Sequence, residues 1–109
     1  MDPLSAAFAA LADPSRRTLL QRLAHGPATS GQLAELLSVS RPATSQHLGV
    51  LQDAGLVNTV AIGRHRWQEL GPAPIYLVED WTGRLVETWA FAPTIRTSQR
   101  EAQRQKERS

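Results

Sequence analysis

The fold is decided by residues 29–55, which read TSGQLAELLSVSRPATSQHLGVLQDAG. Their first part predicts a short helix, because either Thr29 or Ser30 can cap the free amides at its start. Apolar side chains then recur at helical spacing, at Leu33, Leu36 and Leu37. Only residues 38–40 separate this helix from the next apolar repeat, so we expect two helices joined by a tight turn.

The second helix of this pair carries the most informative polar side chains. We expect Ser40 to cap it, with Pro42 in its first turn, where a missing amide hydrogen costs no hydrogen bond. Gly55 is placed to end it in a left-handed conformation. The inward positions recur at i, i+4 and i+7 and are filled by Thr44, Leu48 and Leu51. The exposed face is left with Arg41, Ser45 and Gln46.

A change from helical to extended patterns follows this pair. Residues 56–62 are apolar and rich in β-branched side chains, Gly63 and Arg64 form a turn, and residues 65–70 are again extended. This pattern predicts a two-stranded hairpin.

Further helices flank the pair and the hairpin. Residues 4–12 form one, and Asp13 followed by Pro14 caps the start of another. A last helix opens near Pro72 and Pro74 and ends before Pro93. The chain is therefore predicted to be mostly α with a small β-hairpin, in the order α-α-α-α-β-β-α, which is a winged helix-turn-helix.

The composition restricts the class of protein. The chain has 109 residues, enough for one domain, and it has no cysteine, so it forms neither disulfides nor thiolate metal sites and fits a reducing cytoplasm. It has no signal-peptide pattern and no apolar run near the roughly 20 residues of a membrane span. Arginine supplies all but one of its twelve basic residues, although the net charge is only +2.

The predicted fold indicates which residues would contact DNA. A winged helix-turn-helix places the second helix of the pair, called the recognition helix, in the major groove, with the first residues of that helix towards the bases. We predict DNA contacts there from Ser40, Arg41, Pro42, Ser45 and Gln46. Arginines at the tip of a hairpin reach outward to the backbone or a minor groove, which adds Arg64, His65 and Arg66. The alternative is a helical pair whose polar face only meets water.

Several segments resemble the ArsR-type winged-helix repressors, in particular their metal-independent members. The resemblance implies a homodimer built on the first and last helices, an inverted-repeat operator of double-stranded DNA, and repression. It also implies a bacterial cytoplasmic protein that lies at the nucleoid when bound to DNA. The matching segments are Phe8–Arg17, Leu33–Leu37, Val39–Leu48, Leu51–Val57 and Gly63–Trp67.

The chain departs from the metal-responsive members of that family. Those members place cysteines in the helix before the recognition helix, where this chain has residues 33–39 without one. Other members bind the metal with histidines and carboxylates of the last helix, yet all three histidines here precede residue 66. Glu79 and Asp80 do lie on the last helix, but adjacent residues point about 100° apart, so these two do not readily share a metal. We therefore expect no metal site and no cofactor.

Apolar residues of the first and last helices exceed what a chain of this size easily covers, which favours a dimer interface. The expected contacts are Leu4, Phe8, Leu11, Val78, Trp81, Leu85 and Trp89. The two tryptophans also allow a pocket for an inducer, which the sequence does not identify.

These features assign residues 1–92 to a DNA-binding and dimerisation domain. Residues 93–109 form a polar basic tail, which we expect to be disordered or weakly helical. No catalytic motif is present, so an enzyme is not expected. The remaining alternative is a winged-helix module that binds proteins and does not read DNA sequence.

Overall fold

The structure, a computed structural model, describes residues 1–108. The chain divides into two compact units, Met1–Glu79 and Asp80–Ser109. The division falls inside α5. The assignment of residues 1–92 to a DNA-binding and dimerisation domain stays a prediction. The elements are α1 (Pro3–Leu11), α2 (Pro14–Leu23), β1 (Ala28–Thr29), α3 (Ser30–Leu37), α4 (Arg41–Asp53), β2 (Val57–Ile62), β3 (His65–Leu70), α5 (Ala73–Ala90) and α6 (Ile95–Arg108).

The predicted helix starts of the first unit are confirmed by their caps. Asp13 caps α2 and Ser40 caps α4, each with a side-chain oxygen that accepts a backbone amide three residues on. At the start of α3 the cap is Thr29 and not Ser30. Thr29 Oγ1 accepts from the Gln32 amide at 3.2 Å, and Gln32 Oε1 accepts from the Thr29 amide at 2.9 Å, which makes a capping box.

Two arginines hold α1 against the start of α2. Arg16 Nε donates to the carbonyl of Ala10 at 2.7 Å, and Arg17 Nη1 donates to the carbonyl of Leu11 at 2.8 Å. These carbonyls belong to the last turn of α1, where no intrahelical partner exists. The two guanidinium groups therefore cap the end of α1, that of Arg16 from a part-buried position and that of Arg17 from the surface.

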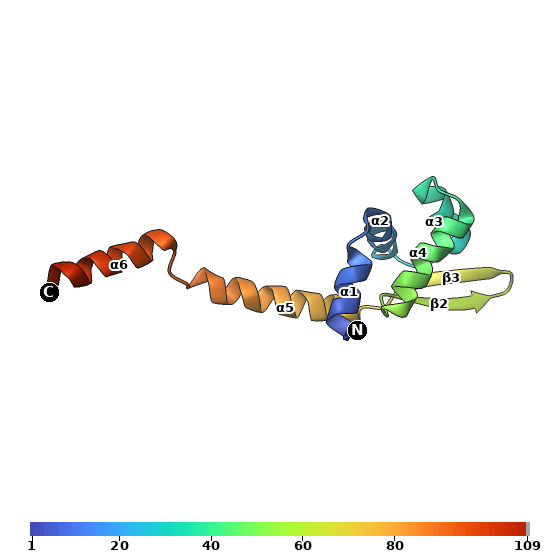
Figure 1. Cartoon of the computed structure of the whole chain (residues 1–109). Coiled ribbons are helices and arrows are strands. Elements are labelled where there is room, and N and C mark those ends of the chain that lie inside the picture. The colour runs from blue at the N-terminus through green and yellow to red at the C-terminus, as the bar shows by residue number, and fades with distance from the viewer. Residues whose placement is uncertain (109) are drawn as a thin grey trace. The chain divides into compact units, whose positions relative to one another are not determined.

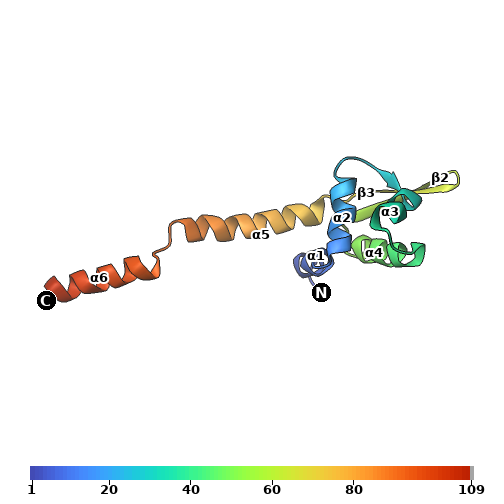
Figure 2. The ribbon, with the colours of Figure 1, turned by 90° about the horizontal axis from the view of Figure 1, so that it is seen from above.

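The core of the first unit lies among α2, α3, α4 and the start of β2. Figures 1 and 2 show these helices gathered beside the base of the hairpin, whose turn projects beyond them. The largest fully buried apolar side chains are Leu19, Leu33, Leu51 and Leu56. The inward positions predicted for α4 are confirmed, since Thr44, Leu48 and Leu51 are all buried.

The sheet has three strands, one more than predicted. All pairs are antiparallel, and the order is β1-β3-β2. The predicted hairpin is confirmed, with Val60 opposite Trp67 and Ile62 opposite His65. The extra strand β1 pairs Ala28 with Gln68. A two-residue strand is too short to show an alternating pattern, and its partner lies far along the chain, so the sequence gives no local signal for it.

The tail contains a helix. Of the two alternatives, disorder and weak helix, the structure has the helical one, α6, over Ile95–Arg108. None of the residues described in α6 is buried. Among residues 1–108, no helix combines the length and the apolar character needed to cross a membrane.

The base of the hairpin packs so closely on the end of α4 that it leaves no room for a side chain at Gly71. The Gly71 amide donates to the Leu56 carbonyl at 2.8 Å, and a Cβ at Gly71 would lie 2.2 Å from the carbonyl oxygen of Gly55. We expect Gly71→Ala to lower the free energy of unfolding by about 1–3 kcal/mol, measured by urea denaturation, because backbone must shift.

The control is Gly49→Ala inside α4, where an added Cβ meets nothing within 4 Å. There the exchange should raise the stability by up to about 1 kcal/mol, because alanine is the better helix former. Equal effects at the two positions would contradict the tight packing at Gly71.

Candidate nucleic-acid interface

The first two turns of α4 present a continuous polar surface. Ser38 ends α3 in a left-handed conformation, with φ of 54°, so the chain turns within three residues into the cap of α4. The five residues predicted there are all exposed, namely Ser40, Arg41, Pro42, Ser45 and Gln46. Arg41 and Ser45 are four residues apart, as are Pro42 and Gln46, so the side chains of each pair lie on the same side of α4.

The hairpin, or wing, presents the second set of predicted residues. Gly63 has φ of 59°, which suits the tight turn, and Arg64, His65 and Arg66 are exposed. Consecutive strand residues point to opposite faces, so Arg66 lies on the face of the sheet that carries Gln68, and His65 lies on the other. The wing therefore offers a basic side chain towards α4, besides those at its tip.

The structure brings the two predicted sets together at one point. A hollow of about 210 Å³ lies between α4 and the wing and is lined by Ser45 of α4 and Arg66 of β3, along with Ser30, Leu48, Gln52 and Gln68. Ser45 of α4 and Arg66 of the wing thus border the same hollow.

A buried glutamine, which the sequence analysis missed, joins the wing to the helix pair. Gln68 is only 2% exposed. Its Oε1 accepts from Thr59 Oγ1 of β2 at 2.6 Å and from Gln52 Nε2 of α4 at 3.4 Å. Its Nε2 donates to Ser30 Oγ of α3 at 3.0 Å, and Gln52 Nε2 also donates to Thr59 Oγ1. One side-chain amide therefore contacts three other elements.

A sequence signal for Gln68 does exist. In the predicted strand 65–70, alternation places Gln68 on the same face as Leu70, which is the face towards the core. A polar residue at such a position requires hydrogen-bond partners when it is buried. Among the described residues no buried side-chain nitrogen or oxygen atom lacks a partner.

Asp13 connects the cap of α2 to α4. Its Oδ1 accepts from the Arg16 amide at 3.1 Å and lies 3.9 Å from His47 Nδ1. The pKa of the Asp13 carboxyl lies below its usual value, chiefly because the Arg16 amide donates to the ionised form, with smaller contributions from the Ser15 amide and His47. His47 is half-buried and thus faces the half-buried carboxylate of Asp13, apart from the exposed side chains of α4.

The residues predicted for a dimer interface differ in exposure. Trp81, Leu85 and Trp89 are 48%, 56% and 74% exposed. Phe8 is 39% exposed, and Leu4 and Val78 are half-buried. Leu11 packs against the core of the first unit and, with Leu20 and Ile75, lines an apolar hollow of about 330 Å³.

Within residues 1–108 no three side chains of histidine, cysteine, aspartate or glutamate lie close enough to hold a metal ion.

Comparisons with known proteins point to one group. A family model described as a helix-turn-helix domain matches residues 11–60. An HTH-type transcriptional regulator of Mycobacterium tuberculosis is 53% identical over 66 residues, which cover 61% of this chain and 62% of the relative. The transcriptional repressor SdpR of Bacillus subtilis is 31% identical over 74 residues, 68% of this chain and 82% of the repressor. A crystal structure of an ArsR family transcriptional regulator matches with a TM-score of 0.76 and 37% identity, covering 83% of this chain and 93% of that one.

These matches cover unequal shares of the relatives. The chain spans less than two thirds of the length of the mycobacterial regulator, but most of the length of SdpR and of the crystallised regulator.

Removal of the Gln68 amide tests its role in the fold. Gln68→Leu leaves Ser30, Thr59 and Gln52 without their buried partner, which we expect to lower the free energy of unfolding by about 1–3 kcal/mol. Asn58→Leu is the matched control, because Asn58 is an exposed amide on the opposite face of the sheet, where a substitution changes stability by no more than about 0.5 kcal/mol. Thermal or urea unfolding measures both. A Gln68→Leu chain as stable as the Asn58→Leu chain would rule out this role.

Proposed function

The chain belongs to the ArsR family of winged helix-turn-helix transcriptional regulators, and we propose that it is a homodimeric repressor that binds an inverted-repeat operator. In this proposal α4 enters the major groove, and the wing contacts the backbone or a minor groove. The observation that carries it is the shared surface at the hollow between α4 and the wing, bordered by Ser45 and Arg66. The family acts in the regulation of transcription and not in catalysis.

The roles proposed on α4 follow from side-chain chemistry. Arg41 suits a guanine, because its guanidinium can donate two parallel hydrogen bonds to the O6 and N7 atoms. Gln46 suits an adenine in the same way. Ser40 and Ser45 suit phosphate oxygens, which the partial positive charge at the start of a helix also attracts. Pro42 supports this contact by fixing the backbone of the first turn.

The DNA contacts proposed for the wing depend less on the base sequence than those proposed for α4. Arg64 lies at the turn and is free to reach a phosphate or a minor groove, and His65 follows it at the start of β3. Arg66 lies on the face towards α4, so we propose that it binds a backbone phosphate between the DNA contacts of α4 and those of the wing tip. The wing would then strengthen binding to all sequences and would help to set the register of α4.

The dimer is proposed from the apolar surface of α1 and α5. Leu85 and Trp89, together with Val86, line an apolar hollow of about 350 Å³ on α5. Exposed apolar side chains in such number mark an interaction surface more often than a solvent face. A two-fold dimer places two copies of α4 at a fixed separation, which matches an inverted repeat with half-sites about one helical turn apart.

The arginine roles are separable by experiment. We expect Arg64→Ala to weaken binding to every duplex and to reduce the slope of log K against log salt by about one unit. Arg41→Ala should cost about 1–3 kcal/mol on the preferred operator and much less on unrelated duplex. Fluorescence anisotropy over a salt series, with an operator identified by footprinting, measures both effects.

Arg84→Gln serves as the control, because Arg84 is exposed and pairs with Asp80 on its own helix. It should leave both the slope and the sequence preference unchanged. A chain that binds no duplex even at low salt would favour the alternative, a winged-helix module that binds proteins.

The dimer proposal predicts the effect of a charge on α5. Leu85→Asp would bury an unpaired carboxylate in the interface, so we expect the dimer dissociation constant to rise about a hundredfold or more, measured by analytical ultracentrifugation. Ile62→Asp is the matched control, since Ile62 is 60% exposed on the wing, close to the 56% of Leu85. If both variants kept the oligomeric state of the unaltered chain, α5 would not form the interface.

A further inference from the structure

The helix α6 holds a concentration of positive charge that the proposed role of α4 and the wing does not use. Residues 95–108 contain five basic side chains against two acidic ones, Glu101 and Glu107. Within the described part of the chain, none of the five forms an ion pair. The basic side chains are Arg96, Arg100, Arg104, Lys106 and Arg108.

The rest of the chain lacks such a surplus. Residues 1–94 carry seven basic and eight acidic side chains. Several of these arginines are already engaged, because Arg16, Arg17 and Arg22 donate to backbone carbonyls and Arg84 pairs with Asp80. The winged helix-turn-helix therefore has a few local cations, but no overall positive charge with which to attract a polyanion.

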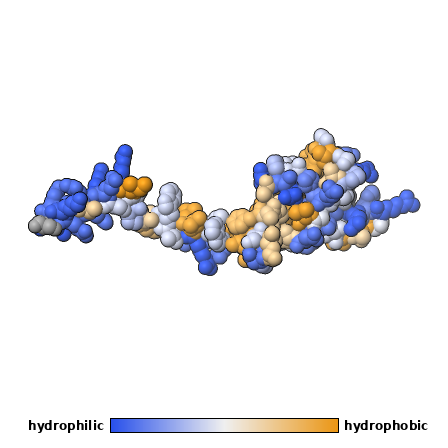
Figure 3. Space-filling view, in the orientation of Figure 1, coloured by the Kyte–Doolittle hydropathy of each residue, from blue (hydrophilic) through white to orange (hydrophobic). Residues whose placement is uncertain are grey.

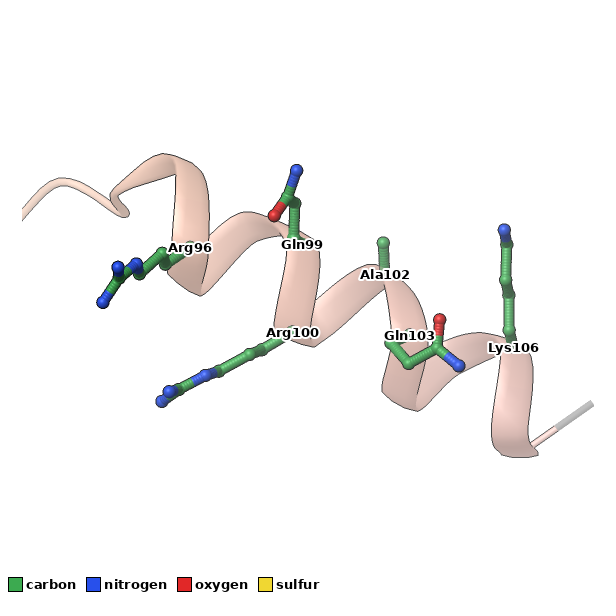
Figure 4. A pocket seen from close by; sticks show the side chains of 6 residues that line it. All are labelled: Arg96, Gln99, Arg100, Ala102, Gln103 and Lys106. Carbon is green, nitrogen blue, oxygen red and sulfur yellow. The ribbon is translucent and has the colours of Figure 1, made fainter.

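The four arginines of α6 form a row. Each lies four residues after the previous one, so they recur on neighbouring turns about 6 Å apart along the axis. Figure 4 shows Arg96 and Arg100 extended on the same side of the helix, with Gln99 and Lys106 on another side. The hollow drawn in Figure 4 includes Arg96 and Arg100 of the row, and all the residues that border it belong to α6, so it is an open helix face and not an enclosed pocket.

Such a row is unfavourable without a counter-charge. Like charges four residues apart destabilise a helix, and no buried residue of α6 compensates for this. A partner that neutralises the row would remove the repulsion. Apolar side chains are scarce on α6, as Figure 3 shows, and are limited to Ile95 and Ala102, so the helix lacks the apolar face with which a membrane-surface helix binds lipid.

We propose that α6 is a second DNA contact, which binds the phosphate backbone of duplex DNA without reading its sequence. This inference rests on the proposed function, because α4 and the wing bring the chain to DNA and so present α6 at a high effective concentration. Guanidinium groups match phosphate oxygens in a bidentate geometry, which suits an arginine row better than a lysine row. The helix supplies general affinity, whereas α4 supplies the preference for an operator.

The test uses the full-length chain with four substitutions, R96Q, R100Q, R104Q and R108Q. Binding is measured on a mixed-sequence duplex and on the operator over a salt series. Each phosphate contact contributes about 0.9 to the slope of log K against log salt, so the loss of four contacts should lower the slope by about 3.6 for each bound chain on both duplexes. The ratio of the two affinities should stay the same, because α4 is unaltered.

Two matched variants define the result. Replacing the same four arginines with lysine keeps the charge, so the slope should stay near that of the unaltered chain. Replacing Glu101 and Glu107 with glutamine should strengthen binding to both duplexes. A four-glutamine variant with an unchanged slope would overturn the proposal.

The outcome separates this proposal from that for α4 and the wing. If α4 did not read DNA, the unaltered chain would show no preference for any sequence, but the slope on mixed duplex would still fall in the four-glutamine variant. If α6 did not touch DNA, the operator preference and the effect of Arg64→Ala would persist while the four-glutamine variant behaved like the unaltered chain.

Vesicles of phosphatidylserine and phosphatidylcholine test whether α6 binds an anionic membrane surface instead of DNA. We expect no retention of the chain on them at the salt concentration where mixed duplex is bound. Retention that depends on the four arginines, together with an unchanged slope on DNA, would assign α6 to a membrane surface and overturn the DNA proposal.

Discussion

The buried amide of Gln68 is the contact on which the proposed interface depends. A hairpin of two strands has little stability by itself and can change its angle to the domain that carries it. Here Gln68 hydrogen-bonds to α3, α4 and β2 at once. Any change in the angle of the wing would break hydrogen bonds that are shielded from water, where their loss is costly. The hydrogen bonds of Gln68, which also lines the hollow, therefore hold Ser45 and Arg66 in place around it.

The position of each arginine in the chain separates those that hold the fold together from those proposed to bind DNA. Arg16 and Arg17 follow the cap of α2 within one turn, so their long side chains reach back to the last carbonyls of α1. Those guanidinium groups are held by backbone carbonyls of α1, although Arg17 remains exposed. Arg41 and Arg64 instead follow a cap and a turn that leave their side chains outside the core. The number of arginines alone therefore indicates little about function, whereas the caps and turns beside each arginine indicate whether its side chain contacts the fold or extends into solvent.

Local rules account for much of what could be predicted from the sequence. The cap at Ser40, the stop at Gly55 and the hairpin turn at Gly63 each depend on residues close in sequence, and each is confirmed. The strand β1 pairs with Gln68, and the Gln68 amide also reaches Ser30, which is 38 residues away; no local pattern shows either contact. The sequence does not decide between helix and disorder for α6, because helix propensity and like-charge repulsion act in opposite directions there. The exposure of the α4 residues could be predicted, but their relation to Arg66 required the sheet register.

The uneven distribution of charge has a consequence for selectivity. Base recognition, the role proposed for α4, relies on hydrogen bonds whose strength depends only weakly on salt. Phosphate binding, the role proposed for the arginine row of α6, depends on the release of counterions and weakens steeply as salt rises. A chain that combines the two holds any duplex at low salt and becomes more dependent on its operator at higher salt. Because residues 1–94 carry no surplus of positive charge, the winged helix-turn-helix adds little non-specific attraction of its own. If both proposals hold, general affinity can be changed on α6 without altering the surface of α4 that is proposed to read the bases.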